Sequence, residues 1–153
     1  MPPLLPSWAP NFHPLVIHFP IVLVMTAAVV DLVDVAFERS PWLKAATTTL
    51  YVMGAISLIV AYVTGLQAAS TVRIPGMAYP VIAAHGQWAL VTMAYCLVVA
   101  TLRLVVLRGD GGRSRRRRML LLGVGLVSVV LIQQTAERGA RLVYEFGTGI
   151  IGR

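Results

Sequence analysis

Four stretches of this chain are long and apolar enough to cross a lipid bilayer, and they restrict the fold more than any other feature. They cover Pro14–Phe37, Leu43–Ala69, Val81–Leu107 and Met119–Thr135. A helix needs roughly 20 apolar residues to span the hydrocarbon core, and in lipid it satisfies its backbone hydrogen bonds internally. Of the 153 residues, 58% are hydrophobic and only 12% are charged. The sequence therefore predicts an all-α protein, a polytopic membrane four-helix bundle with up-down connectivity.

The fourth helix is expected to continue beyond its apolar segment. Charged residues recur there at intervals of about three to four, which is the spacing of one helix face. These residues are Glu137, Arg138, Arg141 and Glu145. The helix should run to about Tyr144 and end through Gly147 and Gly149. We predict a single transmembrane domain over residues 1–153, with helices at about 14–37, 43–69, 81–107 and 119–144.

A run of arginines predicts the orientation of the bundle. Arg113–Arg118 reads "RSRRRR" and lies between the third and fourth helices, and loops rich in Arg and Lys remain in the cytoplasm. Both termini would then face the periplasmic or outer side of the bacterial inner (cytoplasmic) membrane, where we place this multi-pass protein. The cluster favours anionic membrane lipids as partners. No nucleic acid is expected despite the net charge of +7, because no nucleic-acid-binding module accompanies the charge.

In this topology, polar residues from all four helices gather in one layer near the outer surface. His18 and His85 each lie about one turn inside a helix, at similar depth, whereas His13 precedes the first helix. Ionisable residues at membrane depth are costly and usually face the bundle interior, so the layer is a candidate functional site. Its other members are Gln67, Gln133, Gln134, Glu137, Arg138, Arg141, Tyr144 and Glu145.

The prolines around His18 have different expected effects. Pro14 fits the first turn of a helix, where its missing N–H costs nothing. Pro20 removes the backbone hydrogen bond to the carbonyl of Val16 and should kink the helix beside His18. A kink there would widen the mouth of the bundle.

Three chemistries suit the histidines of this layer. The first is a b-type haem held by two imidazoles from facing helices, with small residues giving some of the room that a flat macrocycle needs. The second is a divalent metal site that adds His13 and Glu137 or Glu145. The third is a quinone pocket lined by a histidine and a Glu or Tyr. Hydrogen-bonded packing of the histidines, without any ligand, is the structural alternative.

At the opposite end of the first helix, Asp31 and Asp34 lie about three residues apart on one helix face. Lys44, Arg103 and Arg108 are within plausible reach of them. We expect interfacial ion pairs that fix the end of the helix, and we predict no functional site there.

Two segments of the chain resemble a known family. "HPLVIHFPIVL" (His13–Leu23) and "RGARLVYEFGTGI" (Arg138–Ile150), together with a lone histidine in the third helix, resemble a bacterial family of four-helix integral membrane proteins of unknown function with the signature His-Pro-x-x-x-His-Phe-Pro. Members often occur near c-type cytochromes and membrane dehydrogenases, so the resemblance implies a redox context and carries over His13, His18 and His85. Members often show Gly-His-x-Gly-Gly where this chain has Glu137, so a four-histidine site or a second haem is not expected.

These observations lead to one predicted function. We expect a membrane redox subunit that binds one b-type haem near the periplasmic side through His18 and His85, as metal ligands, and relays electrons between a partner redox protein and the quinone pool. The other cofactor-binding candidates are His13, Glu137, Arg138 and Arg141. The alternatives are a cofactor-free structural or assembly subunit of a larger membrane complex, or a quinone- or metal-binding membrane protein. Short loops leave no room for a catalytic domain, so we expect a non-catalytic subunit of a redox or bioenergetic complex.

Overall fold

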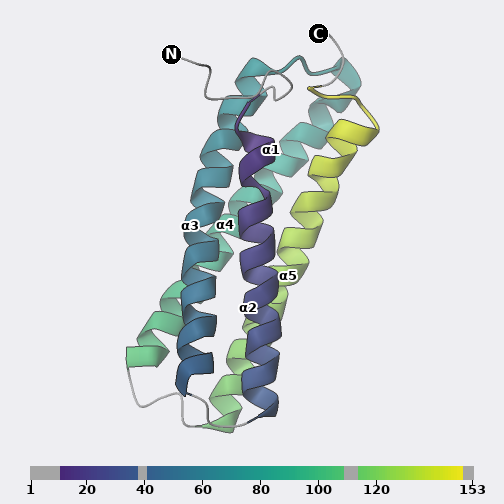
Figure 1. Cartoon of the computed structure of the whole chain (residues 1–153). Coiled ribbons are helices and arrows are strands. Elements are labelled where there is room, and N and C mark those ends of the chain that lie inside the picture. The colour runs from purple at the N-terminus through teal and green to yellow at the C-terminus, as the bar shows by residue number, and fades with distance from the viewer. Residues whose placement is uncertain (1–10, 38–40, 109–113, 150–153) are drawn as a thin grey trace, which may run out of the picture.

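The computed structural model describes residues 11–37, 41–108 and 114–149, and long helices account for nearly all of them. The elements are α1 (His13–Val16), α2 (His18–Ala36), α3 (Pro41–Thr71), the short 3-10 helix η1 (Gly76–Ala78), α4 (Tyr79–Arg108) and α5 (Arg115–Tyr144). Figure 1 shows that α1 continues in line with α2, so that the two together form one span beside α3, α4 and α5.

Four helical segments in the described residues are long and apolar enough to cross a membrane: His13–Ala36, Pro41–Thr71, Gly76–Val106 and Arg115–Tyr144. Each predicted apolar segment coincides with one of them, and two extend one residue beyond it at the C-terminal end, so the all-helical, four-span prediction is confirmed. Large apolar side chains such as Phe19, Val29 and Val63 are exposed on the outside of the bundle, as expected for a surface covered by lipid. The orientation in the membrane stays a prediction.

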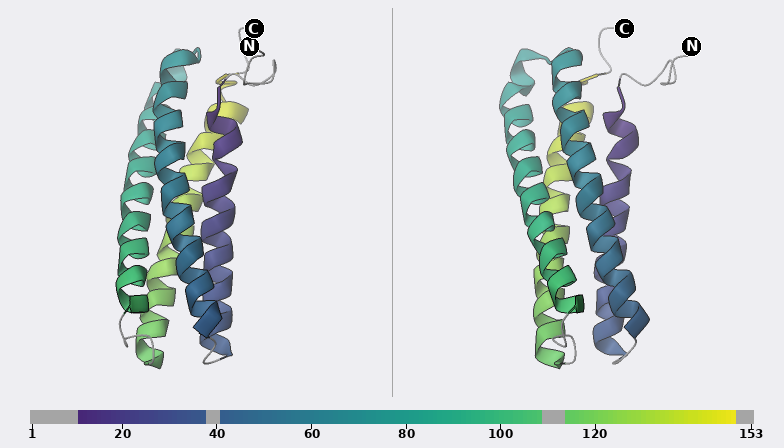
Figure 2. Two further views of the ribbon diagram at one scale, coloured as in Figure 1. Left: turned by 60° about the vertical axis from the view of Figure 1, so that its left-hand side comes forward. Right: turned by 90° about the vertical axis from the view of Figure 1, so that its left-hand side faces the viewer.

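The helices form a ring in which α2 and α4 each pack against both α3 and α5, which places α2 and α4 diagonally (Figures 1 and 2). The core between them contains Val24, Ala27, Tyr51, Val99 and Ile132. Consecutive helices run in opposite directions, so α1, η1 and the last turn of α5 share one end of the bundle. We call this the histidine end, and the opposite end, with Arg108 and Arg115–Arg118, the arginine end.

The first span is interrupted at Ile17, three residues before Pro20. Pro20 has no N–H to donate to the carbonyl of Val16, so the regular hydrogen-bond pattern is broken there. The amide of Ile17 donates to the carbonyl of His13 at 3.1 Å and closes α1. At the other end of α1, the amide of His13 donates to Oδ1 of Asn11 at 3.0 Å.

The last span also ends as predicted. α5 continues to Tyr144, and Gly147 and Gly149 follow with φ values of 60° and 82°. Only glycine adopts such left-handed conformations without a steric cost, which is why helices commonly end this way. The amide of Gly147 donates to the carbonyl of Val143 at 3.0 Å and satisfies one of the last helical acceptors.

The two helical hairpins, α2–α3 and α4–α5, repeat the same burial pattern. Asp31 and Arg103 are 72 residues apart, and the same interval separates His13 from His85. Other buried residues of α2 recur in α4 at that interval; these pairs are Val24 with Cys96, Ala27 with Val99, and Ala28 with Ala100. An up-down ring of four helices has an approximate two-fold axis along its length, and across it His13 meets His85 and Asp31 meets Arg103.

Candidate functional site

At the histidine end, the structure brings together His13 of α1 and His85 of α4. Their ring centroids are 6.5 Å apart, and the ring planes are inclined by 77°. Both residues are partly buried, whereas His18 is exposed on the outside of the bundle. The histidine beside His85 is therefore His13, and the predicted pairing of His18 with His85 is not what the structure shows.

The physical reason lies in how the first helix is rotated about its own axis. The prediction placed His13 before the helix, at the interface, but the structure makes His13 the first residue of α1. Five residues separate His13 from His18, which is about 140° around a helix, so the two rings point to different faces. The packing of α1 against α3 turns His13 toward the bundle interior, and His18 therefore faces outward.

Each imidazole is oriented by an oxygen on the following helix of its own hairpin. Nδ1 of His85 lies 3.0 Å from the carbonyl oxygen of Thr135, and a carbonyl can only accept, so Nδ1 carries the hydrogen. Nδ1 of His13 lies 3.2 Å from Oγ1 of Thr64. That hydroxyl also lies within hydrogen-bonding distance of the carbonyls of Val60 and Ala61, at 2.9 and 3.1 Å, and when it donates to either of them it accepts from Nδ1 of His13. With Nδ1 protonated, a neutral imidazole presents a bare lone pair at Nε2, which is how metal-ligating histidines are commonly held.

A glycine supports each ring. A Cβ added to Gly65 of α3 would lie 3.1 Å from Cε1 of His13, and one added to Gly139 of α5 would lie 3.1 Å from Cε1 of His85. The rings therefore lie directly against the backbone of the neighbouring helix. A Cβ added to Gly86, the residue that follows His85 in α4, would meet nothing within 4 Å, so the surface of α4 at Gly86 is open.

Arg138 is the charged residue that completes this site. Its guanidinium lies over the ring of Trp88, 4.4 Å from the centroid, and Trp88 is about one turn from His85 on α4. Nη1 of Arg138 donates to the carbonyl and the side-chain oxygen of Gln134, at 2.6 and 3.1 Å. A cation is thus fixed beside His85 at the histidine end.

The other predicted cofactor-binding residues lie on the surface. Glu137 is exposed. Arg141 is exposed as well and pairs with the exposed Glu145, with Nε 3.0 Å from Oε1. The structure therefore gathers His13, His85 and Arg138 and leaves Glu137 and Arg141 outside the group.

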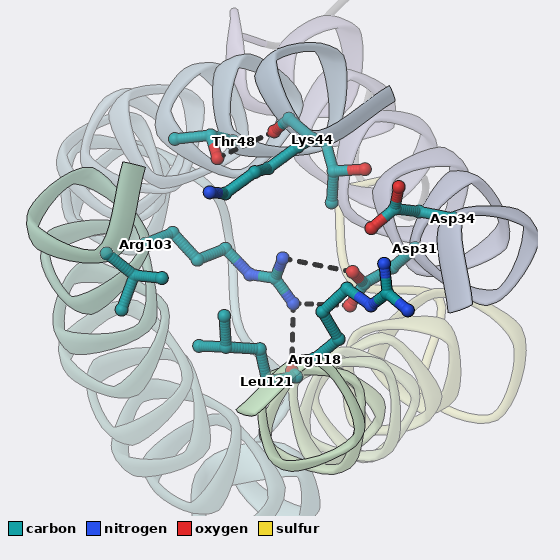
Figure 3. Close-up of a pocket in the computed structure, with 9 residues that line it drawn as sticks. Asp31, Asp34, Lys44, Thr48, Arg103, Arg118 and Leu121 are labelled. Carbon is teal, nitrogen blue, oxygen red and sulfur yellow. Dashed lines mark hydrogen bonds and ion pairs between the residues drawn. The ribbon is translucent and has the colours of Figure 1, made fainter. Parts of the chain in front are cut away.

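The arginine end contains a second polar group, a buried ion pair (Figure 3). Arg103 donates through Nη1 to Oδ1 of Asp31 at 3.1 Å and through Nη2 to Oδ2 of the same carboxylate. Nη2 also donates to the carbonyl of Leu121 at 2.8 Å, and the guanidinium lies 4.2 Å from the ring centroid of Tyr51. The predicted ion pairing at this end is confirmed, with Arg103 as the partner of Asp31.

A small cavity of about 20 Å³ adjoins this pair (Figure 3). Its lining also includes Asp34, Lys44, Thr48 and Arg118. A space of this size is sufficient for one water molecule.

Sequence reasoning missed Thr64 and Thr135, which orient the histidines, and Gly139, which lies against His85, whereas Gly65 belongs to the small-residue pattern of α3. The small-residue pattern of α3 was visible in the sequence, but membrane helices use such patterns for packing in general. The 72-residue interval that relates His13 to His85 and Asp31 to Arg103 is the signal that could have identified the correct pair.

The chain belongs to the family described as "Predicted membrane protein (DUF2231)", whose model matches residues 9–152. No curated protein and no solved structure matches it.

Proposed function

We propose that this DUF2231 protein is a haem-binding subunit of a membrane redox chain and that His13 and His85 are the two ligands of one b-type haem. The observation that carries the proposal is the paired arrangement of the imidazoles, each with its Nδ1 held by an oxygen. When bound, such a haem supplies one-electron oxidation and reduction. The protein would relay electrons between a partner redox protein and the quinone pool.

The spacing of the rings supports a shared metal. Two imidazoles on opposite sides of one metal, with bonds of about 2 Å, have centroids roughly 6 Å apart. The observed separation is 6.5 Å. The two donors also come from diagonal helices, so the space between them is inside the bundle.

The number of donors favours haem over an isolated metal ion. In the part of the chain that the structure describes, no three His, Cys, Asp or Glu residues form a group that could hold a metal ion. Structural and catalytic zinc sites use three or four protein ligands. Two imidazoles are sufficient for haem iron, because the porphyrin supplies the remaining nitrogens. Arg138, fixed beside His85, is the cation suited to a haem propionate.

The test is the visible spectrum of the purified protein, produced in cells supplied with haem precursor. We expect a reduced-minus-oxidised difference spectrum of b type and about one haem per chain. His13→Ala and His85→Ala should abolish it. His18→Ala is the matched control, because His18 is exposed, and it should keep the spectrum.

Two results would reject the proposal. One is a helical, monodisperse wild-type protein without haem, which would leave the histidines as packing residues and favour the cofactor-free assembly subunit. The other is loss of haem in His18→Ala with retention in His13→Ala, which would restore the pairing expected from the sequence.

A further inference from the structure

His18, the second histidine of the "HPLVIHFP" segment, takes no part in the histidine pair. It is exposed on the outside of the bundle, although it lies about 7–8 Å inside the first span. Gln133 of α5 is another exposed polar residue within a span. Neither side chain forms a hydrogen bond with another of the described residues. Polar side chains at membrane depth usually face the bundle interior, so two that face the lipid are candidates for binding a ligand.

The two residues lie at the same level on neighbouring helices. α2 packs against α5 and runs in the opposite direction. His13 meets His85, which lies against Gly139, so these three residues mark one level of the bundle. His18 comes five residues after His13, about 7.5 Å toward the arginine end. Gln133 comes six residues before Gly139, about 9 Å in the same direction. The two side chains are therefore level to within about 2 Å.

Both side chains are also turned toward the seam between α2 and α5. A Cβ added to Gly54 of α3 would lie 3.6 Å from Cβ of Leu23, so Leu23 marks the side of α2 that faces α3. His18 is five residues from it, about 140° around the helix. Arg138, which lies over a ring of α4, marks the side of α5 that faces α4, and Gln133 is again five residues away. An exposed residue turned away from α3, or from α4, lies on the outer rim of this seam.

The seam is reached from the lipid. α1 packs against α2 and α3 rather than against α5, and Figure 1 shows α5 leaning away from α1 toward the histidine end. The residues about one turn from His18 and Gln133 on the same helix faces, Val22 and Val130, are exposed and apolar. Packed helices have axes about 8–10 Å apart, so side chains on the two rims are able to contact one flat ring between them. A ligand that arrives by this route must itself be lipophilic.

We propose that His18 and Gln133 bind the head group of a quinol that enters this seam from the membrane. The inference rests on the proposed function, in which a haem held by His13 and His85 exchanges electrons with the quinone pool. A quinol has a hydroxyl group at each end of its ring and an apolar tail, which match two polar side chains within an apolar surface. A ring nitrogen of His18 accepts a hydrogen bond from one hydroxyl, and the side-chain oxygen of Gln133 accepts from the other.

Oxidation of the quinol breaks its two O–H bonds and yields the quinone, two protons and two electrons. His18 takes up each proton in turn on its ring nitrogen and releases it toward the outer water. Glu137, exposed one turn above Gln133 on the same face of α5, is the carboxylate that receives the proton on the way out. The electrons pass one at a time to ferric haem iron at the level of His13, and from there to the partner redox protein.

The test is the reduction of the haem-loaded protein by decylubiquinol, followed by stopped-flow as the appearance of the reduced b-type spectrum. His18→Ala should keep its haem but be reduced at least about 100-fold more slowly than the wild type, because a positioned proton acceptor contributes a factor of this order. Gln133→Ala should also react more slowly. Gln67→Ala makes the same change at an exposed position of α3, and it should react like the wild type. Dithionite, which needs no quinol site, should reduce all four proteins equally.

A second measurement does not need haem. In haem-free protein in lipid nanodiscs, a photoreactive azidoquinone should label α2 and α5 near His18 and Gln133, and excess decylubiquinone should prevent the labelling. Equal reduction rates for the wild type and His18→Ala, or a wild type that dithionite reduces and decylubiquinol does not, would overturn the quinol site and leave the haem ligands in place. A protein that binds no haem would reject the proposed function. In that case the labelling decides, and label elsewhere, or label that decylubiquinone does not prevent, would overturn the site.

Discussion

Replacing Arg103 should destabilise the bundle severely, and replacing Asp31 as well should restore most of the lost free energy of unfolding. Arg103 and Asp31 are each within a few per cent of complete burial, and Arg103 donates to both oxygens of the carboxylate and to the carbonyl of Leu121. Arg103→Met would leave the carboxylate buried without its counter-charge. Breaking a buried pair in this way costs about 3–5 kcal/mol, equivalent to a change of roughly 10²–10³ or more in the unfolding equilibrium.

The double variant Asp31→Leu/Arg103→Met has no buried charge left at this position. Apolar replacements of a buried pair are often neutral or stabilising, so we expect its stability to lie within about 1 kcal/mol of the wild type. Asp31→Leu alone should cost as much as Arg103→Met alone, because it leaves the guanidinium buried without its counter-charge, so the coupling energy of the double-mutant cycle should be at least about 5 kcal/mol in magnitude. The free energy of unfolding would be measured by SDS titration in mixed micelles, with helicity followed by circular dichroism.

The exposed ion pair between Arg141 and Glu145 is the control. Arg141 and Glu145 are 45% and 50% exposed, and exposed pairs at this helical spacing contribute only about 0.3–0.5 kcal/mol. Arg141→Met should thus be nearly silent in the same titration. A coupling energy between Asp31 and Arg103 as small as that of the exposed pair would refute the reasoning, because it would mean that burial adds nothing to their interaction.

Three further predictions follow from the glycines and from the arginine-rich loop. Gly125→Ala should destabilise the protein by about 1–3 kcal/mol in the same SDS titration, because the added Cβ would overlap Oη of Tyr51 and overpacking has this cost. Gly123→Ala is the control and should leave the stability unchanged, because a Cβ added to Gly123 meets nothing within 4 Å. Tyr51→Phe should partly rescue Gly125→Ala. Gly139→Ala should shift or abolish the b-type spectrum while the protein keeps its helicity, because the added Cβ presses on the ring of His85. An unchanged spectrum in a folded variant would mean that the contact with Gly139 does not affect how His85 binds haem. A reporter enzyme fused to the carboxyl terminus should be active only outside the cytoplasm, and cytoplasmic activity would reverse the orientation.

The sequence by itself determined the spans and their ends. Four apolar segments of membrane length must be helical, because a helix satisfies its own backbone hydrogen bonds in lipid. Pro20 interrupts the first span and Gly147 ends the last one through local backbone chemistry, which does not depend on the rest of the fold. The presence of a polar layer at one end could likewise be read from depth alone, and His13, His85 and Arg138 were among its predicted members.

Only the tertiary structure decided which of these residues meet. Depth along a helix is linear in the sequence, but the direction of a side chain turns by 100° per residue, so the rotation of α1 about its axis decides whether His13 or His18 faces the bundle centre. The choice of Arg103 over Lys44 as the partner of Asp31 likewise depends on how diagonal helices are rotated toward the axis. These rotations are set by packing contacts among all four helices, and a single helix does not specify them.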